Sequence, residues 1–216
     1  MIVGVALAGG QSRRMGRDKA LLPLPEALGG GDMVTWTAHR LSQVCDEVLM
    51  ADGGRSRVAG YLSVHDGVGK GPAAGILGAA AARPGRSLLV LACDLPLVPV
   101  SLLRRLAAGD GSADWIVPAA SGDRLEPLCA LYGPAALRCL ENRVRAGRFA
   151  LHGLAREAGL AIDRLDAARW RQESDVEIFT NINAPEDFKK LAAVRQKLLA
   201  AGSDQPVESV EQRSNE

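Results

Sequence analysis

The feature that most constrains the fold is a regular alternation between short apolar runs and longer segments with helical spacing. The apolar runs are typical of buried strands, and they lie at 2–8, 47–51, 61–65, 87–92, 115–119 and 128–132. The segments with apolar residues three and four apart predict helices at 35–44, 73–82, 101–108 and 135–145, with a last helix from about Pro185. Continuous apolar strands that alternate with helices predict a doubly wound α/β fold, in which helices cover both faces of a mostly parallel sheet.

The length of 216 residues is typical of one domain. We predict that this domain spans residues 1–200 and that the polar residues 201–216 form a disordered tail. Pro23–Asp32 carries two prolines and three consecutive glycines, which predicts an irregular excursion from the fold.

The composition excludes several classes of protein. With 26 Lys+Arg against 25 Asp+Glu and only eight aromatic residues (three Trp, two Tyr, three Phe), the chain lacks the basic surface and stacking platform of a nucleic-acid binder. No apolar run approaches the roughly 20 residues that span a bilayer, and the first residues lack the basic region of a signal peptide. We therefore expect a cytoplasmic protein without a membrane partner. The four scattered cysteines predict buried free thiols.

A glycine-rich loop follows the first predicted strand. The segment Leu7–Lys19 contains three glycines, three arginines and one lysine. Glycines let backbone N–H groups approach an anion, and basic side chains neutralise its charge, so this segment predicts a phosphate cradle rather than an ordinary surface turn. The chain contains no P-loop motif, since Gly69 and Lys70 are followed by Gly71 and not by a serine or threonine. The dinucleotide-binding fingerprint does not follow the first predicted strand either, which argues against a nicotinamide oxidoreductase.

Two aspartates also follow predicted strands. In open α/β sheets, ligands bind at the carboxyl ends of the strands, so Asp94 faces the same crevice as the glycine-rich loop. A carboxylate beside phosphates is what Mg²⁺ requires, although a simple turn before Pro96 is an alternative. Asp66 precedes the glycine-rich stretch Gly67–Gly75, and it is a candidate ligand of base or ribose, or else a helix cap.

Five motifs occur in one order along the chain. They are Leu7–Lys19, Gly71–Ile76 (GPAAGI), Cys93–Pro96 (CDLP), Glu126–Tyr132 (EPLCALY) and Asn181–Asp187 (NINAPED). Together they resemble the molybdenum cofactor guanylyltransferase family, also called the molybdopterin-guanine dinucleotide biosynthesis protein A family. This is a branch of the nucleotidyltransferases with a Rossmann-like sheet. The resemblance extends from residue 1 to about residue 190.

The resemblance implies that GMP is transferred from GTP to the terminal phosphate of molybdenum-carrying molybdopterin, with release of pyrophosphate. By matching positions, the nucleotide would be bound by Leu7, Ala8, Gly9, Gly10, Lys19, Asp66 and Asp94. Asp94 would also bind Mg²⁺, and Asn181 and Asn183 would lie on the pterin side. Handing over a labile cofactor would bring the chain into transient contact with the molybdenum-inserting protein and with acceptor molybdoenzymes.

The chemistry of such a transfer needs no nucleophilic side chain. A phosphate monoester has a second pKa of about 6, so the attacking oxygen is already ionised near neutrality. Catalysis then falls to positioning and charge neutralisation, for which we predict Lys19, Asp94 and Arg14. We further hypothesise that Arg14 and Arg17 clamp the phosphates.

The sequence departs from the family pattern at three places. Ala51 stands where an asparagine is frequent, and Asp52 could take over its contact with base or ribose. The excursion Pro23–Asp32 replaces a shorter turn, and Ala184 replaces a threonine. Three alternatives stay open: a cytidylyltransferase that uses CTP on the same pterin, another small-molecule nucleotidyltransferase, and a non-catalytic nucleotide-binding scaffold.

Overall fold

The computed structural model describes residues 1–9, 19–24, 30–109, 111–119, 124–166, 178–182 and 187. Its centre is one seven-stranded sheet in the order β3-β2-β1-β4-β6-β5-β7. The strands are β1 Ile2–Leu7, β2 Glu47–Ala51, β3 Leu62–Val64, β4 Ser87–Ala92, β5 Trp115–Pro118, β6 Cys129–Tyr132 and β7 Ile162–Leu165. Neighbouring strands are parallel except where β6 pairs with β4 and β5.

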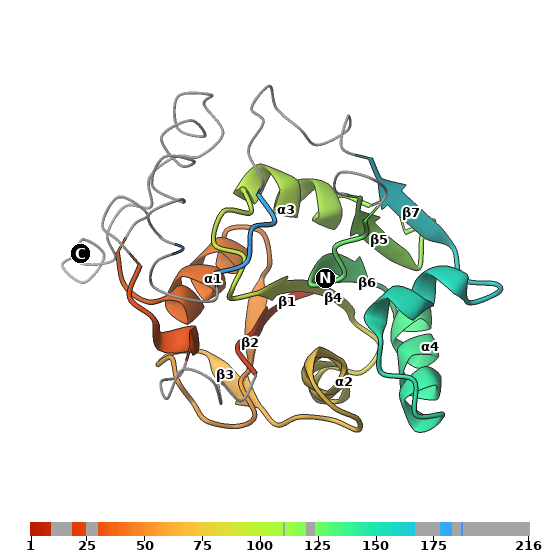
Figure 1. Cartoon of the computed structure of the whole chain (residues 1–216), viewed down its shortest axis with the longest axis horizontal. Helices are drawn as coiled ribbons and strands as arrows, with labels where there is room; N and C mark the ends of the chain where they lie inside the picture. Colours follow the sequence, from red (N-terminus) through yellow and green to blue (C-terminus); the bar gives the residue numbers. More distant parts are fainter. Residues whose placement is uncertain are drawn as a thin grey trace.

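Helices cover both faces of this sheet. Figure 1 shows α1 (Met33–Ser42) and α3 (Val100–Ala107) on one face, and α2 (Pro72–Ala82) and α4 (Pro134–Arg145) on the other. Two 3₁₀ helices, η1 (Lys19–Leu21) and η4 (Leu151–Arg156), complete the described elements. This arrangement confirms the predicted doubly wound, mostly parallel α/β fold.

The three neighbouring strands β2, β1 and β4 end at one level of the sheet. Leu7 of β1 pairs with Ala51 of β2 on one side and with Ala92 of β4 on the other. The chain builds the sheet from β1 toward β3 and then returns to place β4 on the opposite side of β1. The carboxyl ends of β1 and β4 therefore flank the point where strand order reverses, which is where open α/β sheets bind ligands.

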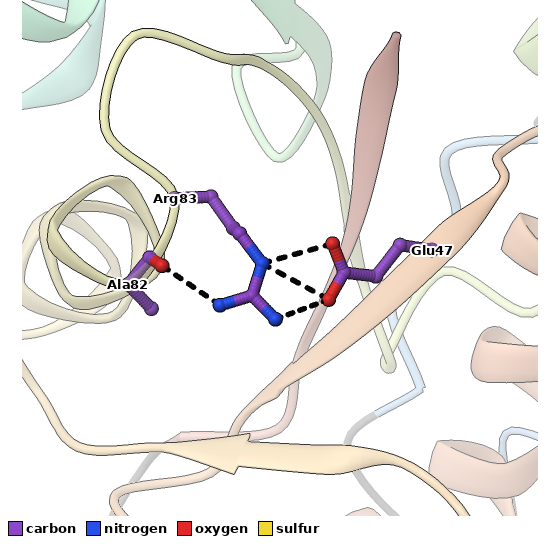
Figure 2. A network of polar contacts seen from close by, with 3 residues as sticks. All are labelled: Glu47, Ala82 and Arg83. Atoms are coloured by element: carbon purple, nitrogen blue, oxygen red, sulfur yellow. Dashed lines mark hydrogen bonds and ion pairs between the residues drawn. The ribbon is translucent and has the colours of Figure 1, made fainter.

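Helix α2 is attached closely to the sheet at both of its ends. A Cβ added to Gly75 would lie 3.1 Å from Leu7 Cδ2, and one added to Gly78 would lie 2.0 Å from the His65 carbonyl oxygen, so the helix can approach only because these residues are glycines. At its other end, Figure 2 shows Arg83 between Ala82 and Glu47 of β2. Arg83 Nε donates to the two Glu47 carboxylate oxygens at 3.0 and 2.9 Å, and Nη1 donates to the Ala82 carbonyl at 2.8 Å.

The sequence-based boundaries agree with the structure for most elements, and strands 47–51 and 87–92 are confirmed at both ends. Four features are not predicted: the reversed direction of β6, the helices η1 and η4, and the strand β7. The ends of the excursion Pro23–Asp32 pair with each other, since Pro23 bridges Asp32 and the Leu24 N–H donates to the Gly31 carbonyl at 2.9 Å. The predicted last helix and the predicted tail lie outside the described residues, apart from Asp187.

All four cysteines are free, as predicted, and Cys45, Cys93 and Cys129 are buried while Cys139 is half-buried. Burial, with a smaller contribution from Asp46, raises the pKa of Cys45 to about 12. Within the described part of the chain, no helix is long and apolar enough to cross a membrane.

Candidate nucleotide-binding site

Backbone hydrogen bonds hold the ends of β1, β2 and β4 together. The Ala8 N–H donates to the Ala51 carbonyl, and the Cys93 N–H donates to the Leu7 carbonyl, both at 3.1 Å. Leu7 and Ala8 are buried, whereas Gly9 is exposed. The chain therefore reaches the surface at Gly9, within the glycine-rich loop, at the side of the sheet formed by the carboxyl ends of β1, β2 and β4.

Asp66 lies near three glycines, one after β1, one after β2 and one within helix α2. Cβ atoms added to Gly9 and Gly75 would each lie 3.9 Å from Asp66 Oδ1, and one added to Gly53 would lie 3.9 Å from Oδ2. The cap of α2 is Gly71, which makes no side-chain cap bond, so Asp66 does not cap this helix. An exposed carboxylate above small residues is suited to accept hydrogen bonds from a flat, polar ligand.

Asp94 lies just after β4, at the same edge of the sheet. Its side chain is half-buried, with the Oδ1 atom shielded from solvent, and its backbone carbonyl accepts the Ile182 N–H at 2.9 Å. This bond brings Asn181, which is exposed, next to Asp94. Two segments that are far apart in the sequence therefore meet at the predicted magnesium ligand.

The donor set around Asp94 fits Mg²⁺. Among the described residues, no three His, Cys, Asp or Glu side chains gather into a group that could hold a metal ion by themselves. Mg²⁺ is commonly bound by one or two carboxylates together with substrate phosphates and water, so a single carboxylate such as that of Asp94 is compatible with it.

Helix α1 holds the segment that follows Asp94. Trp36 Nε1 donates to the Pro96 carbonyl at 3.1 Å, and Arg40 Nη2 donates to the Val98 carbonyl at 2.6 Å. The Arg40 guanidinium also lies over the Trp36 ring, 4.9 Å from its centroid. Both side chains are buried. No spacing in the sequence predicts this attachment.

Asp52, at the end of β2, is used within its own turn. Its side chain is fully buried. Oδ1 accepts the backbone N–H groups of Gly54 and Arg55, and Oδ2 accepts that of Arg57, each at 3.1 Å. The Ser63 hydroxyl also donates to Oδ1. Burial raises the pKa of Asp52, but the bonds from Ser63 and the two arginine amides outweigh it and hold the pKa below its ordinary value. The expectation that Asp52 replaces the frequent asparagine as a nucleoside contact is therefore wrong, because its carboxylate has no exposed surface.

The remaining predicted residues lie where the structure gives little or no description. The backbone of Lys19 begins η1, but its side chain lies outside the described part. Gly10, Arg14, Arg17 and Asn183 also lie outside the described residues. Of the predicted site, the structure thus brings together Leu7, Ala8, Gly9, Asp66, Asp94 and Asn181 at one edge of the sheet.

The chain is similar to known proteins of one family. A family described as the MobA-like NTP transferase domain matches residues 4–158. The molybdenum cofactor guanylyltransferase of Cereibacter sphaeroides is 36% identical over 204 residues, which cover 91% of this chain and 98% of that protein. The chain belongs to the molybdenum cofactor guanylyltransferase family. It is a nucleotidyltransferase, as predicted.

Further members and solved structures extend the comparison. A probable molybdenum cofactor guanylyltransferase of Pelotomaculum thermopropionicum is 33% identical over 87% of this chain and 90% of its own length. The crystal structure of molybdopterin-guanine dinucleotide biosynthesis protein A from Archaeoglobus fulgidus superimposes with a TM-score of 0.72 at 25% identity, over 91% of this chain and all of that one. A 2-C-methyl-D-erythritol 4-phosphate cytidylyltransferase from Thermus thermophilus shares the fold, with a TM-score of 0.63 at 18% identity over 89% of this chain and 98% of that one.

Proposed function

We propose that this guanylyltransferase family member transfers GMP from GTP to the terminal phosphate of molybdenum-carrying molybdopterin and releases pyrophosphate. The observation that carries the proposal is the meeting of Gly9, Asp66 and Asp94 at the point where strand order reverses. The Asp66 carboxylate lies near glycines, and Asp94 follows the central strand β4. The carboxyl ends of the strands therefore offer separate places for a nucleoside and for phosphates.

The nucleoside would lie over the glycines. Leu7, Ala8, Gly9 and Gly10 would contact it through the backbone, and Asp66 would accept hydrogen bonds from ribose hydroxyls or from guanine N–H groups. The small residues around Asp66 support this assignment, since a Cβ on Gly9, Gly53 or Gly75 would come within 3.9 Å of its carboxylate.

The phosphates would lie toward Asp94. This residue would hold Mg²⁺, which when bound neutralises phosphate charge and orients the leaving group. Lys19 and Arg14 would add positive charge, and Arg17 would assist them as a clamp.

The transfer itself is an in-line displacement. An ionised oxygen of the pterin phosphate attacks the α-phosphorus of GTP, the new O–P bond forms, and the bond from the α-phosphorus to pyrophosphate breaks with its electron pair leaving on pyrophosphate. The chain's role is to align the two substrates at the edge of the sheet. Asn181 and Asn183 would lie on the pterin side, and the bond from the Ile182 N–H to the Asp94 carbonyl supports the placement of Asn181 beside the reacting phosphates. The enzyme would work in the cytoplasm and pass its product on through transient contact with the insertion protein and acceptor enzymes.

The test is thermal unfolding with Mg²⁺ and, separately, GTP, CTP, ATP and UTP. A ligand at one hundred times its Kd stabilises a protein by about 2.7 kcal/mol, which raises the Tm of a chain of this size by several degrees. We expect this increase with GTP, and we expect Asp94→Asn and Lys19→Ala to reduce it. Asp46→Asn is the control, because Asp46 is exposed and precedes β2 at the opposite edge of the sheet.

The other outcomes are equally informative. An increase with CTP alone would favour a cytidylyltransferase with the same acceptor. An increase with GTP that persists in Asp94→Asn and Lys19→Ala, without turnover in the wild type, would favour the scaffold. No increase with any nucleotide would contradict the proposal.

A further inference from the structure

Arg57, in the connection between β2 and β3, reaches Ala8, the residue that follows β1. Its Nη1 donates to the Ala8 carbonyl at 3.0 Å, across 49 residues of sequence, and to the Asp52 carbonyl at 3.2 Å. The side chain is half-buried, so these bonds are partly shielded from competing water. A charged donor thus joins the end of β2 to the residue that follows β1.

These bonds fix the orientation of the peptide between Ala8 and Gly9. The Ala8 N–H already donates to the Ala51 carbonyl, and the Ala8 carbonyl accepts from Arg57, so both backbone groups of Ala8 are held. The peptide bonds of the described residues are trans, and a trans peptide is planar with its C=O and N–H pointing in opposite directions. With the Ala8 carbonyl turned toward Arg57, the Gly9 N–H points away from it, and its direction is set by the guanidinium.

Apart from the bond of the guanidinium to the Asp52 carbonyl, the turn from which it comes is built by other groups. The Asp52 carboxylate organises that turn through the backbone N–H groups of Gly54, Arg55 and Arg57 and the Ser63 hydroxyl. A different side chain at residue 57 would keep all of these bonds. The link to Ala8 is therefore an addition to the turn, and it adds to the pairing of β1 with β2 and to the bond from the Ala8 N–H to the Ala51 carbonyl.

We propose that Arg57 is a positioning residue for nucleotide binding: by holding the Ala8 carbonyl, it presents the Gly9 N–H to the guanine nucleotide. This inference rests on the proposed function, which places the nucleoside against Ala8 and Gly9. Arg57 acts on the nucleoside end of the site, whereas the reacting phosphorus lies toward Asp94, so its effect falls on binding rather than on the chemical step.

The experiment compares Arg57→Ala, Arg57→Lys and Arg55→Ala in the full chain. Arg55 is the matched control, because it is exposed, lies in the same turn, and its bond to Asp52 comes from a backbone N–H that alanine keeps. The measurements are KM for GTP and kcat with Mg²⁺ and the pterin substrate, the Kd of GTP by calorimetry, and the Tm without nucleotide. Loss of a charge-assisted hydrogen bond predicts that Arg57→Ala raises KM and Kd for GTP about tenfold while kcat stays within about threefold.

Arg57→Lys keeps the charge but loses the forked guanidinium, so we expect an intermediate Kd, and Arg55→Ala should match the wild type. A wild-type Kd for GTP in Arg57→Ala overturns the inference, and so does a fall in kcat that parallels a fall in the Tm without nucleotide, since that is a structural role. If Arg57→Ala does not fold, Arg57→Lys must show the same separation between KM and kcat. A wild-type protein that binds no GTP overturns the proposed function itself, and this result is distinct because it appears before any variant is made.

Discussion

Glu126 is a half-buried residue whose carboxylate charge is poorly solvated in the folded state. It precedes β6, its side chain is only 14% exposed, and its Oε1 lies 2.8 Å from Nη2 of Arg124, which is itself largely exposed. Burial raises the pKa of Glu126, although the positive charges of Arg124 and His152 oppose this. A carboxyl with a raised pKa binds its proton more tightly in the folded state, so its ionisation lowers the free energy of unfolding.

We therefore predict that Glu126→Gln stabilises the protein at pH 8 and has little effect at pH 4. Below the ordinary value of 4.5 the carboxyl is protonated in both states, and the cost of ionisation grows as the pH rises through the higher folded-state pKa. The measurement is the Tm of wild type and variant at both pH values. Glu141→Gln is the control, since Glu141 is an exposed helix residue paired with Arg145, and its effect should stay within about 0.5 kcal/mol. A variant that is less stable than wild type at pH 8 would contradict the prediction.

The residues that the sequence reveals are those placed by strand ends. Asp66 and Asp94 could be predicted because each follows an apolar run, and the fold brings such positions to one edge. Trp36, Arg40 and Arg57 could not be predicted, because each donates to a backbone carbonyl 60, 58 or 49 residues away, and no spacing records that contact. The burial of Asp52 did have a signal, since an aspartate before two glycines is typical of a turn closed by its own side chain.

Helix α1 supports the segment after β4 through two side chains one turn apart. Trp36 and Arg40 donate to the carbonyls of Pro96 and Val98, and the guanidinium also lies over the indole ring. Because these side chains are buried, the segment that begins at Asp94 cannot shift without leaving polar groups unsatisfied in the interior.

A double-mutant cycle with Trp36→Phe and Arg40→Met tests this attachment. Each single variant removes one donor from a buried carbonyl, and we expect it to lower the free energy of unfolding by about 1–3 kcal/mol. Since Arg40→Met removes the cation–π contact and Trp36→Phe weakens it, the double variant should fall short of the sum by up to about 0.5–1 kcal/mol. Urea unfolding gives these values, and Arg105→Met, on the exposed face of α3, serves as a control with a change within about 0.5 kcal/mol. Strict additivity of the two changes would show that the side chains act independently.

Elements differ in how much of them the sequence reveals. The central strands β1 and β4 are buried on both faces and stand out as continuous apolar runs. Strand β7 (IDRL) lies at the edge of the sheet, with only Leu165 buried, and therefore has no such pattern. Apolar runs do not encode strand direction, so the pattern predicts a mostly parallel sheet without saying which strand is antiparallel. A signal for β6 was present, since residues 119–128 are too few for a crossover of a dozen residues or more, and this length favours a hairpin.

The match to the family model ends at residue 158, and described residues beyond it complete the core of the domain. Strand β7 pairs with β5, and residues 178–182 then return to the site, where the Ile182 N–H donates to the Asp94 carbonyl. Ile178, Phe179 and Ile182 are buried in the same core as β1 and β4. Residues 178–182 thus contact Asp94, the proposed magnesium ligand, and also contribute to the core.

Two truncations distinguish this closing segment from the predicted tail. A chain ending at residue 200 should keep the Tm of the full chain and its increase with GTP and Mg²⁺, because it removes only the residues predicted to form a polar tail. A chain ending at residue 176 loses the buried residues Ile178, Phe179 and Ile182. The burial of each side chain stabilises the folded state by about 1.5–3 kcal/mol. Their sum is comparable with the free energy of unfolding of an ordinary domain, about 5–15 kcal/mol.

We expect the shorter chain to show no cooperative thermal transition, and we expect Ile182→Ala in the full chain to lower the free energy of unfolding by about 2–5 kcal/mol. Circular dichroism during heating measures all three. If the chain ending at 176 melts like the full protein, residues 178–182 only rest on a core that is complete without them. Ile182→Ala, which keeps the backbone N–H that donates to Asp94, would then leave the Tm unchanged.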